Sequence, residues 1–259
     1  MIARAMTRGA HRPGLVTFVV PAKNEAPAIA RTLRALPVRT LQAAGVRSEG
    51  LILDGNSHDG TREIAEGLGA TVVPDREAGK GAAVRNARAQ FRGDYVVMLD
   101  ADGTYAPDAI PRLLAPLAWG EADVVMGTRD IQSGAMSNLN RVGNALLSLG
   151  ASVLYGRPCP DLCTGLWGFQ AAALNALPLT SRGFELEAEI FSLASRLGLR
   201  IASVPVDYLP RHGITKLSAA RDGLRIGWCL VRSRFVPLTR GVGAAGSAQP
   251  DAIALRVGP

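Results

Sequence analysis

Cysteines, aromatic residues and long apolar runs are all scarce in this 259-residue sequence, which has three cysteines and 5% aromatic residues. Three cysteines are too few for a disulfide framework, and no second Cys or His pair completes a zinc site around Cys159 and Cys163. We therefore expect reduced thiols and a cytoplasmic location. No run of 18 apolar residues occurs, and residues 1–14 lack a signal-peptide core, so we expect neither a membrane span nor a secretory leader.

Acidic residues are in the minority, with 22 against 29 Lys and Arg, and most of the basic excess lies near the C-terminus. From Arg211 to Arg240 there are seven basic residues and one acid, Asp222. Such a stripe indicates a phosphate-bearing partner, which is a nucleotide, an anionic membrane surface or a nucleic acid. Aromatic residues interleaved with the basic ones and known nucleic-acid motifs are both missing, so we expect no nucleic-acid partner.

The first half of the chain alternates strand patterns with helix patterns, and the second half is less regular. Strands are predicted at 15–20, 51–53, 70–73, 95–99, 123–126 and 201–206. Helices are predicted at 27–36, 61–67, 81–91, 107–118, 138–155 and 183–197, with a basic amphipathic helix inside 213–236. This alternation predicts an α/β fold with a mostly parallel sheet and helices on both faces. We expect flexible tails at 1–14 and 241–259.

Two carboxylates follow the most apolar of these strands. The run Tyr95–Leu99 leads directly into Asp100 and Asp102, at the sheet edge where open α/β sheets bind ligands. Two carboxylates among small residues can hold a hard divalent cation, and that cation can neutralise a diphosphate. The structural alternative is an Asp-Gly turn.

Three other loops lead to the same edge of the predicted sheet. Asn24 and Glu25 follow the first strand, and Asp54 ends the second, where an acid can bind a base or a ribose hydroxyl. Glycines around Lys80 open a helix, a geometry that suits phosphate, although the P-loop spacing is absent. Each loop alone also fits a solvated turn or a helix cap. Their convergence on one edge predicts a nucleotide site.

The order of these motifs closely resembles the family 2 glycosyltransferases, and within them the polyprenyl-phosphate (dolichyl-phosphate) mannosyl-, glucosyl- and N-acetylglucosaminyl-transferases. The segments that carry the resemblance span about 15–217 and read PAKNEA, LDGNSHDGT, GKGAAVRNA, VVMLDADGTYAP, VMGTR, RVGN, DLCTGLWGF and VPVDYLPRHGITKL. The resemblance implies a single GT-A domain at 15–210, with a nucleotide-sugar half (15–127) and an acceptor half (128–210). A closing loop and basic helix at 211–240 would follow. It also implies inversion at the anomeric carbon and a Mg²⁺ or Mn²⁺ cofactor.

The resemblance also gives roles on the donor side. The nucleotide sugar would be bound by Pro21, Ala22, Asn24, Glu25, Asp54, Lys80, Asp100, Ala101 and Asp102. Within this set Asp54 would contact the base, and Asp100 and Asp102 would be the metal-binding pair, with Asp102 the more direct ligand. Some relatives have a Gln two residues after the second Asp. Thr104 stands there in this sequence, so a third protein ligand is in doubt and water would replace it.

On the acceptor side, Arg129 and Arg141 match arginines that hold the acceptor phosphate in polyprenyl-phosphate transferases, a role that suits the planar guanidinium fork. Either residue could equally be a solvated surface charge. The loop that closes over the diphosphate and the acceptor would contain Arg211, His212 and Lys216. The backbone of that loop could equally satisfy His212.

Two carboxylates are further candidates for the acceptor site. Asp161 is expected at its floor, and the alternative is a turn or cap acid. Glu185 and Glu189 would share one face of a helix, where like charges are unfavourable, so only part of this stretch need be helical. One of Glu185, Glu187 and Glu189 should face the site, and we choose Glu187.

The charge of the acceptor separates two enzyme hypotheses. A polyprenyl phosphate is already an anion, so it needs no strong base, and positioning by Arg129 matters more. An alcohol must lose a proton to a carboxylate, for which Asp161 and Glu187 are the candidates. In both cases a cation at Asp102 would stabilise the leaving diphosphate of a UDP- or GDP-linked sugar. A binding module that has lost catalysis is disfavoured by the intact Asp pair.

The predicted C-terminal helix bears on the acceptor. Arg221, Arg225 and Arg232 lie close to one helical stripe together with Trp228. A basic helix with Trp can lie in an anionic membrane interface, which would make the protein peripheral on the cytoplasmic membrane face. The alternative is that this helix packs on the sheet with its arginines in water.

Overall fold

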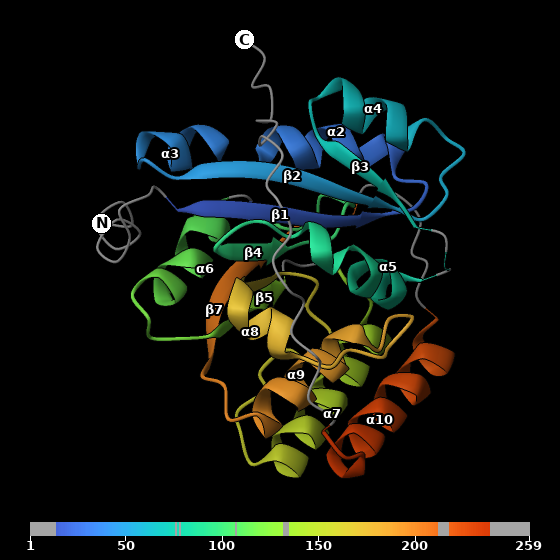
Figure 1. Ribbon diagram of the computed structural model, residues 1–259. Helices are drawn as coiled ribbons and strands as arrows, with labels where there is room; N and C mark the ends of the chain where they lie inside the picture. The colour runs from blue at the N-terminus through green and yellow to red at the C-terminus, as the bar shows by residue number, and fades with distance from the viewer. Residues whose placement is uncertain are drawn as a thin grey trace.

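The computed structural model describes residues 14–75, 77, 79–106, 108–131, 135–211 and 218–238 (Figure 1). The predicted tails, Gly14 apart, and the two site candidates His212 and Lys216 lie outside these residues. The division of the chain into a donor half and an acceptor half stays a prediction.

A seven-stranded sheet runs through the molecule in the order β3-β2-β1-β4-β6-β5-β7. The strands are β1 (Leu15–Ala22), β2 (Arg47–Asp54), β3 (Thr71–Pro74), β4 (Tyr95–Met98), β5 (Val124–Ile131), β6 (Trp167–Gln170) and β7 (Ile201–Tyr208). Only β6 is antiparallel to its neighbours, β4 and β5. The predicted mostly parallel sheet is therefore confirmed. The prediction missed β6, because its four residues include a glycine and carry no alternation.

Helices cover both faces of this sheet. They are α2 (Ala26–Ala35), α3 (Val38–Ala43), α4 (Thr61–Gly67), α5 (Lys80–Ala87), α6 (Ala109–Ala118), α7 (Asn138–Tyr155), α8 (Ala171–Ala176), α9 (Leu186–Arg196) and α10 (Ala219–Phe235), with a 3₁₀ turn at Arg88–Gln90. Figure 1 shows α7, α9 and α10 gathered at the end of the molecule opposite α2, α3 and α4. The sequence predicted α7 with its observed bounds, whereas the short helices α3 and α8 were not predicted.

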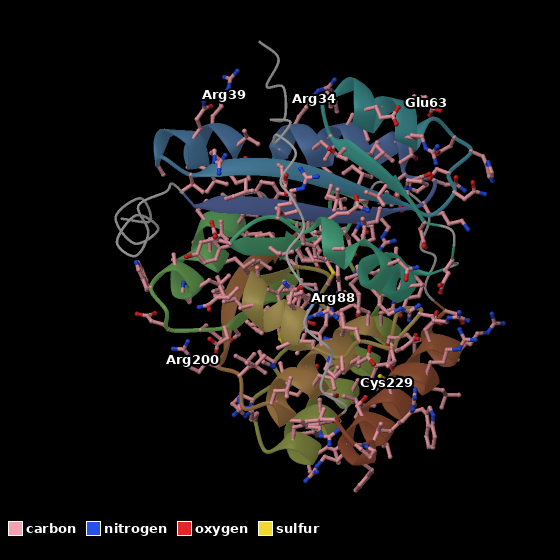
Figure 2. The ribbon with its side chains drawn as sticks, viewed as in Figure 1. Arg34, Arg39, Glu63, Arg88, Arg200 and Cys229 are labelled. Carbon is pink, nitrogen blue, oxygen red and sulfur yellow. The ribbon has the colours of Figure 1, made fainter. Side chains whose placement is uncertain are left out.

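The central strand β1 explains how two cores form. It is buried over almost its whole length, as a strand covered on both sides must be. Val16, Phe18 and Val20 enter one core with α2 and α6, and Val19 enters the other with α5 and α9. The outer surfaces of α2, α3 and α4 are polar, and Figure 2 shows Arg34, Arg39 and Glu63 pointing away from the sheet.

The strands β1, β2 and β4 end together, which places the site. Ala22 pairs with Asp54 in register, and Leu99 donates its backbone N–H to the carbonyl of Val19. Strands β2, β5 and β7 each continue past the C-terminal end of their predicted ranges, to Asp54, Ile131 and Tyr208. The loops that follow β1, β2 and β4 therefore meet at one edge of the sheet, as predicted.

Three free cysteines are present, Cys159, Cys163 and Cys229, in agreement with the expectation of reduced thiols. Within the described ranges, no helix combines the length and the apolar character needed to cross a bilayer.

Candidate active site

The aspartate pair occupies the loop after β4. Asp102 is buried, and its Oδ1 accepts hydrogen bonds from the backbone N–H of Thr104 at 3.1 Å and from the Thr104 hydroxyl at 2.7 Å. Its Oδ2 lies 2.8 Å from the Arg211 guanidinium. Burial and the charge of Asp100 raise the pKa of Asp102, and Arg211 partly offsets this. Thr104, which stands where some relatives have Gln, thus orients Asp102.

Lys80 links the aspartate pair to α9. Its Nζ lies 2.6 Å from Asp100 Oδ1 and 2.6 Å from Glu187 Oε1, with 10% of its side chain exposed. Burial alone would lower the pKa of Lys80, but the two carboxylates outweigh burial and raise it, so the amine stays charged. Burial would likewise raise the pKa of Asp100, and Lys80 instead brings it below the ordinary value. One cation at the start of α5 therefore joins the aspartate loop to α9.

The three glutamates of the predicted α9 segment have different surroundings. Glu185 accepts hydrogen bonds from the backbone N–H groups of residues 182 and 183, and Glu189 accepts from those of residues 180 and 181. Glu187 alone of the three contacts Lys80. Burial raises the pKa of Glu187, although Lys80 acts against it. The structure thus brings Glu187 to the aspartate pair and uses the other two glutamates to fix a loop.

The glycines beside Lys80 serve close packing of backbone. A Cβ on Gly79 or Gly81 would collide with carbonyl groups of Arg182 or Ser181, and the N–H of Ala82 donates to the Arg182 carbonyl at 3.1 Å. Close packing of backbone thus requires glycine at both positions, and phosphate binding at this turn stays a prediction. The Lys80 side chain is directed to the carboxylates of Asp100 and Glu187.

The nucleoside candidates lie in two loops that hold each other. The backbone N–H of Asn24 donates to Ser57 Oγ at 2.9 Å, and Asn24 Oδ1 accepts from the backbone N–H of His58 at 3.0 Å. Asn24 has a φ of 50°, a left-handed conformation that Asn tolerates. The N–H of Glu25 donates to Thr61 Oγ1 at 2.8 Å. These bonds order the loop that follows Pro21 and Ala22.

Asp54 is fully buried at the end of β2. Its carboxylate accepts hydrogen bonds from the backbone N–H of Ser57 at 3.2 Å and from Arg62 at 2.9 Å. Burial would raise the pKa of Asp54, but these bonds outweigh burial and lower it. Asp54 is therefore an ionised group at the end of β2, and its contact with a base stays a prediction.

Arg129 near the end of β5 and Asp161 after α7 form a buried ion pair. Arg129 donates its backbone N–H and its Nε to Asp161 Oδ2, at 2.9 and 2.8 Å, and its Nη2 to Oδ1 at 2.7 Å. Only 7% and 4% of the two side chains are exposed. The guanidinium also lies over the ring of Tyr208, 5.2 Å from its centroid. Burial acts to lower the pKa of Arg129, and Asp161 reverses this, so the guanidinium remains charged.

Asn144 completes this pair from α7. Its Nδ2 donates to Asp161 Oδ1 at 2.9 Å, and its Oδ1 accepts the backbone N–H of Cys163 at 3.0 Å. Arg141 is exposed and lies three residues before Asn144, so the two side chains emerge from neighbouring turns of one helix face. The sequence reasoning did not identify Asn144, Tyr208 or the Lys80 bridge. A polar residue inside an apolar helix was the available signal for Asn144.

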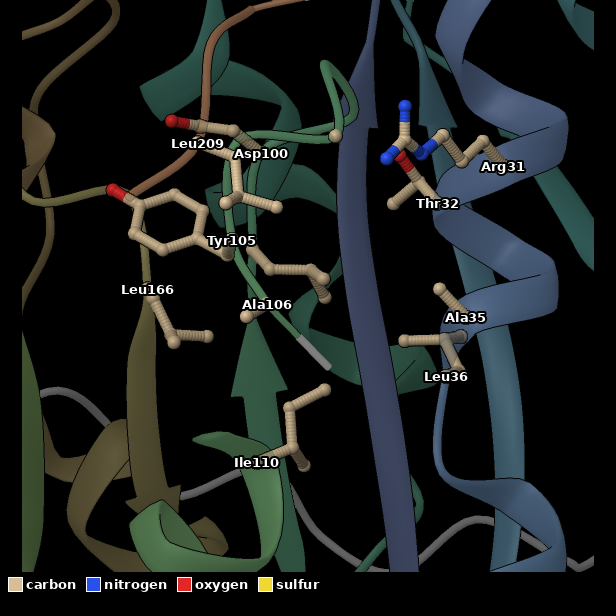
Figure 3. Close-up of a pocket in the computed structure, with 12 residues that line it drawn as sticks. Arg31, Thr32, Ala35, Leu36, Asp100, Tyr105, Ala106, Ile110, Leu166 and Leu209 are labelled. Atoms are coloured by element: carbon tan, nitrogen blue, oxygen red, sulfur yellow. The ribbon is translucent and has the colours of Figure 1, made fainter. Parts of the chain in front are cut away.

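A cavity of about 270 Å³ opens beside the aspartate loop (Figure 3). Apolar side chains from α2, from the segment after β4 and from the segment after β7 line most of the cavity. The charged residues Arg31 and Asp100 are in the upper part of Figure 3. Thr32 Oγ1 donates to the carbonyl of Ala101 at 2.9 Å, which fixes the aspartate loop against α2. Ala101 is itself buried, so its contribution to the site is through its backbone.

Comparison with known proteins places these groups in a family context. The family described as Glycosyl transferase family 2 matches residues 17–177. Glycosyltransferase AglJ of Haloferax volcanii is 37% identical over 220 residues, which cover 82% of this chain and 69% of that protein. Dolichyl-phosphate hexose transferase of the same species is 36% identical over 188 residues, which cover 72% of this chain and 81% of that protein.

A solved structure is similar in fold. Glucosyl-3-phosphoglycerate synthase of Mycobacterium tuberculosis, in complex with Mn²⁺, uridine diphosphate and glucosyl-3-phosphoglycerate, matches with a TM-score of 0.72. The match covers 92% of this chain and 85% of that chain at 24% sequence identity.

Proposed function

The chain belongs to glycosyl transferase family 2 and has a GT-A-like fold, and from this premise we propose that it transfers a sugar from a nucleotide diphosphate sugar to a polyprenyl phosphate. The transfer would proceed with inversion at the anomeric carbon and with Mg²⁺ or Mn²⁺. The name of the related dolichyl-phosphate hexose transferase supports a lipid phosphate as acceptor.

The observation that carries the lipid acceptor is an exposed apolar stripe on α7. Five large apolar side chains at helical spacing are between 58% and 76% exposed: Leu139, Val142, Leu146, Leu149 and Val153. An extended apolar surface of this kind marks an interaction site in a soluble domain. The opposite side of the same helix contacts Asp161 through Asn144. An apolar acceptor bound along the stripe would therefore lie across one helix, about 10 Å, from the Arg129–Asp161 pair.

The neighbouring helix α10 adds charge of the sign that a membrane surface attracts. It packs against α7, since the hydroxyl of Tyr155 donates to the Leu230 carbonyl at 2.8 Å. It exposes a second apolar stripe, composed of Leu224, Trp228, Val231 and Phe235. The exposed Arg221, Arg225 and Arg232 lie along the edge of that stripe. Apolar and basic residues in this arrangement favour peripheral binding to an anionic lipid surface.

The donor side fits a divalent cation with few protein ligands. Asp100 and Asp102 offer hard oxygen donors from one loop, which suits Mg²⁺ or Mn²⁺. Among the described residues no group of three or more His, Cys, Asp or Glu could hold a metal. A cation there would take its other ligands from the diphosphate and water, and would stabilise the charge on the leaving group. Lys80 and Arg211 already contact the two carboxylates and add positive charge near the same place.

The acceptor side favours an acceptor that is already ionised. Both oxygens of Asp161 are engaged by Arg129 and Asn144, so Asp161 is suited to orient Arg129 rather than to remove a proton. Arg129, together with Arg141 from the first turn of α7, would hold the acceptor phosphate. A phosphate oxygen then attacks the anomeric carbon as the bond to the nucleotide diphosphate breaks, and no proton transfer is needed.

A small soluble hydroxylated acceptor is the second candidate. It is favoured by the fold neighbour solved with glucosyl-3-phosphoglycerate. It is also favoured by Glu187, a buried carboxylate with a raised pKa beside the aspartate pair that could serve as the base.

One variant separates the two acceptors. The triple change Val142→Ser, Leu146→Ser and Leu149→Ser removes the centre of the α7 stripe without touching the side that contacts Asp161. We expect it to lose vesicle binding and transfer to long-chain polyprenyl phosphate in anionic vesicles, but to keep transfer to a short, water-soluble prenyl phosphate. A matched change of an exposed apolar residue on another element, Trp119→Ser at the end of α6, should change neither. Unchanged transfer to the long-chain acceptor would refute the lipid surface.

A further inference from the structure

Three polar residues form a row along the inner side of α7. Asn144, Ser148 and Ser152 are spaced by four residues, so they lie on consecutive turns of one helix face. The exposed apolar stripe from Leu139 to Val153 lies on the opposite side of the helix. The inner side of the helix thus combines this polar row with Leu147, Ala151 and Leu154, which pack into a core, while the outer side is apolar and exposed.

Every member of the row holds the segment 159–163. The backbone N–H of Cys159 donates to Ser152 Oγ at 3.0 Å, that of Leu162 to Ser148 Oγ at 2.9 Å, and that of Cys163 to Asn144 Oδ1 at 3.0 Å. Three backbone donors of one five-residue segment are therefore satisfied by side chains of one helix. At its other end, the Asn144 amide donates from Nδ2 to the Asp161 carboxylate.

We propose that Asn144, Ser148 and Ser152 are positioning residues for the acceptor arginine. The row fixes the segment that carries Asp161, and Asp161 in turn holds the backbone, Nε and Nη2 of Arg129. One edge of the guanidinium is thereby committed to the protein, and Nη1 is left to face the acceptor phosphate. The inference rests on the proposed function, and it adds that α7 joins the lipid surface to the acceptor arginine.

Packing alone does not account for the row. Ser148 is buried, and a helix that only had to pack against a loop would gain more from Ala or Leu there. Asn144 uses both ends of its amide, which fixes the rotation of the side chain. A polar network in which each member is paired specifies one geometry, and here that geometry ends at Arg129.

The test compares Asn144→Ala with Asn175→Ala, a control at an exposed position of α8. We expect Asn144→Ala to raise the KM for polyprenyl phosphate by about tenfold or more, with the KM for the nucleotide sugar unchanged. The control should match the wild type in both. Asn144→Asp should be worse than Asn144→Ala, because a second carboxylate would lie against Asp161. Equal effects on both KM values would overturn the positioning role.

A second readout does not depend on activity. In ¹⁵N NMR spectra, the Arg129 Nε–H signal can be assigned by its loss in Arg129→Lys. This proton should exchange slowly with solvent in the wild type and in the control, and rapidly in Asn144→Ala. If Asn144→Ala does not fold, the double variant Ser148→Ala/Ser152→Ala takes its place with the same expectation. Wild-type protein inactive on lipid phosphates would refute the proposed function alone. An unchanged Arg129 signal in the variants would refute the positioning role alone.

Discussion

Replacing Asp161 by Asn tests how strongly the Arg129 ion pair stabilises the protein. The carboxylate accepts three hydrogen bonds from Arg129 and one from Asn144, and 4% of its side chain is exposed. Asp161→Asn keeps the size and one acceptor oxygen but removes the charge. Arg129 would then be a buried cation without its counter-ion.

The size of the effect follows from that burial. Removing one partner of a buried ion pair costs about 3–5 kcal/mol. Because Asn can still accept one hydrogen bond, we expect the lower limit, about 3 kcal/mol of unfolding free energy. For a domain of this size each kcal/mol shifts the Tm by about 2–4 °C, so the Tm should fall by about 6–12 °C.

The chain offers a matched control on its surface. Arg200 gives Asp123 the same three donors, its backbone N–H, Nε and Nη2, at 2.8, 3.1 and 2.6 Å. Arg200 is 54% exposed and lies on the outside of the molecule in Figure 2. Solvent screens such a pair, so Asp123→Asn should keep its Tm within about 2 °C of the wild type. Both variants would be measured by thermal and urea unfolding at neutral pH.

Equal shifts for Asp161→Asn and Asp123→Asn would refute this reasoning. A double variant tests separately whether the ion pair is needed for stability or for transfer. Arg129→Met/Asp161→Leu replaces the pair by apolar side chains, which is often neutral for stability. It should recover most of the lost Tm while transfer to lipid phosphate stays abolished.

Three further predictions concern the donor side. Lys80→Met leaves Asp100 and Glu187 without their shared cation, so the protein should lose about 3–5 kcal/mol of unfolding free energy at pH 7. Part of this loss should be regained at lower pH, because the two carboxylates then take up protons. A loss in urea unfolding that does not depend on pH would contradict this. In Gly165→Ala the new Cβ would collide with the Asp100 carboxylate, so Mn²⁺ titrations with nucleotide should show weaker binding, and wild-type affinity would count against Asp100 as a ligand. The pKa of Asp54 is lowered, so its contribution to stability is complete above its ordinary pKa of 3.8 and is lost as pH falls through the lowered pKa. Asp54→Asn should therefore lose less unfolding free energy than the wild type between about pH 5 and pH 2. The same loss in both proteins would refute the lowered pKa of Asp54.

Local pattern was sufficient for most of the sheet. The apolar runs of β1 and β4 and the helices between them predicted parallel order, because each run has the length and continuity of a buried strand. Strand β6 escaped prediction, since its antiparallel place between β4 and β5 is decided by partners far along the chain. The helices α3 and α8 have only six residues each, too few for a clear periodic pattern.

In the site, too, local pattern predicted some residues and missed those that depend on long-range contacts. Asp100 and Asp102 were placed correctly at the sheet edge because a strand pattern leads directly into them. The Lys80 contacts with Asp100 and Glu187 join residues 20 and 107 positions apart, which no local pattern encodes. The contact of Asn144 with Asp161 likewise depends on how α7 packs against the loop that follows it.

The lipid acceptor is tested most directly by following label between phases. The protein would be incubated with radiolabelled UDP- and GDP-sugars, Mn²⁺ and polyprenyl phosphate in anionic vesicles, in parallel with Asp102→Ala. Our account predicts label in the organic phase for at least one donor, and none with the variant. Label confined to an aqueous product, or absent from the organic phase with every donor, would contradict it.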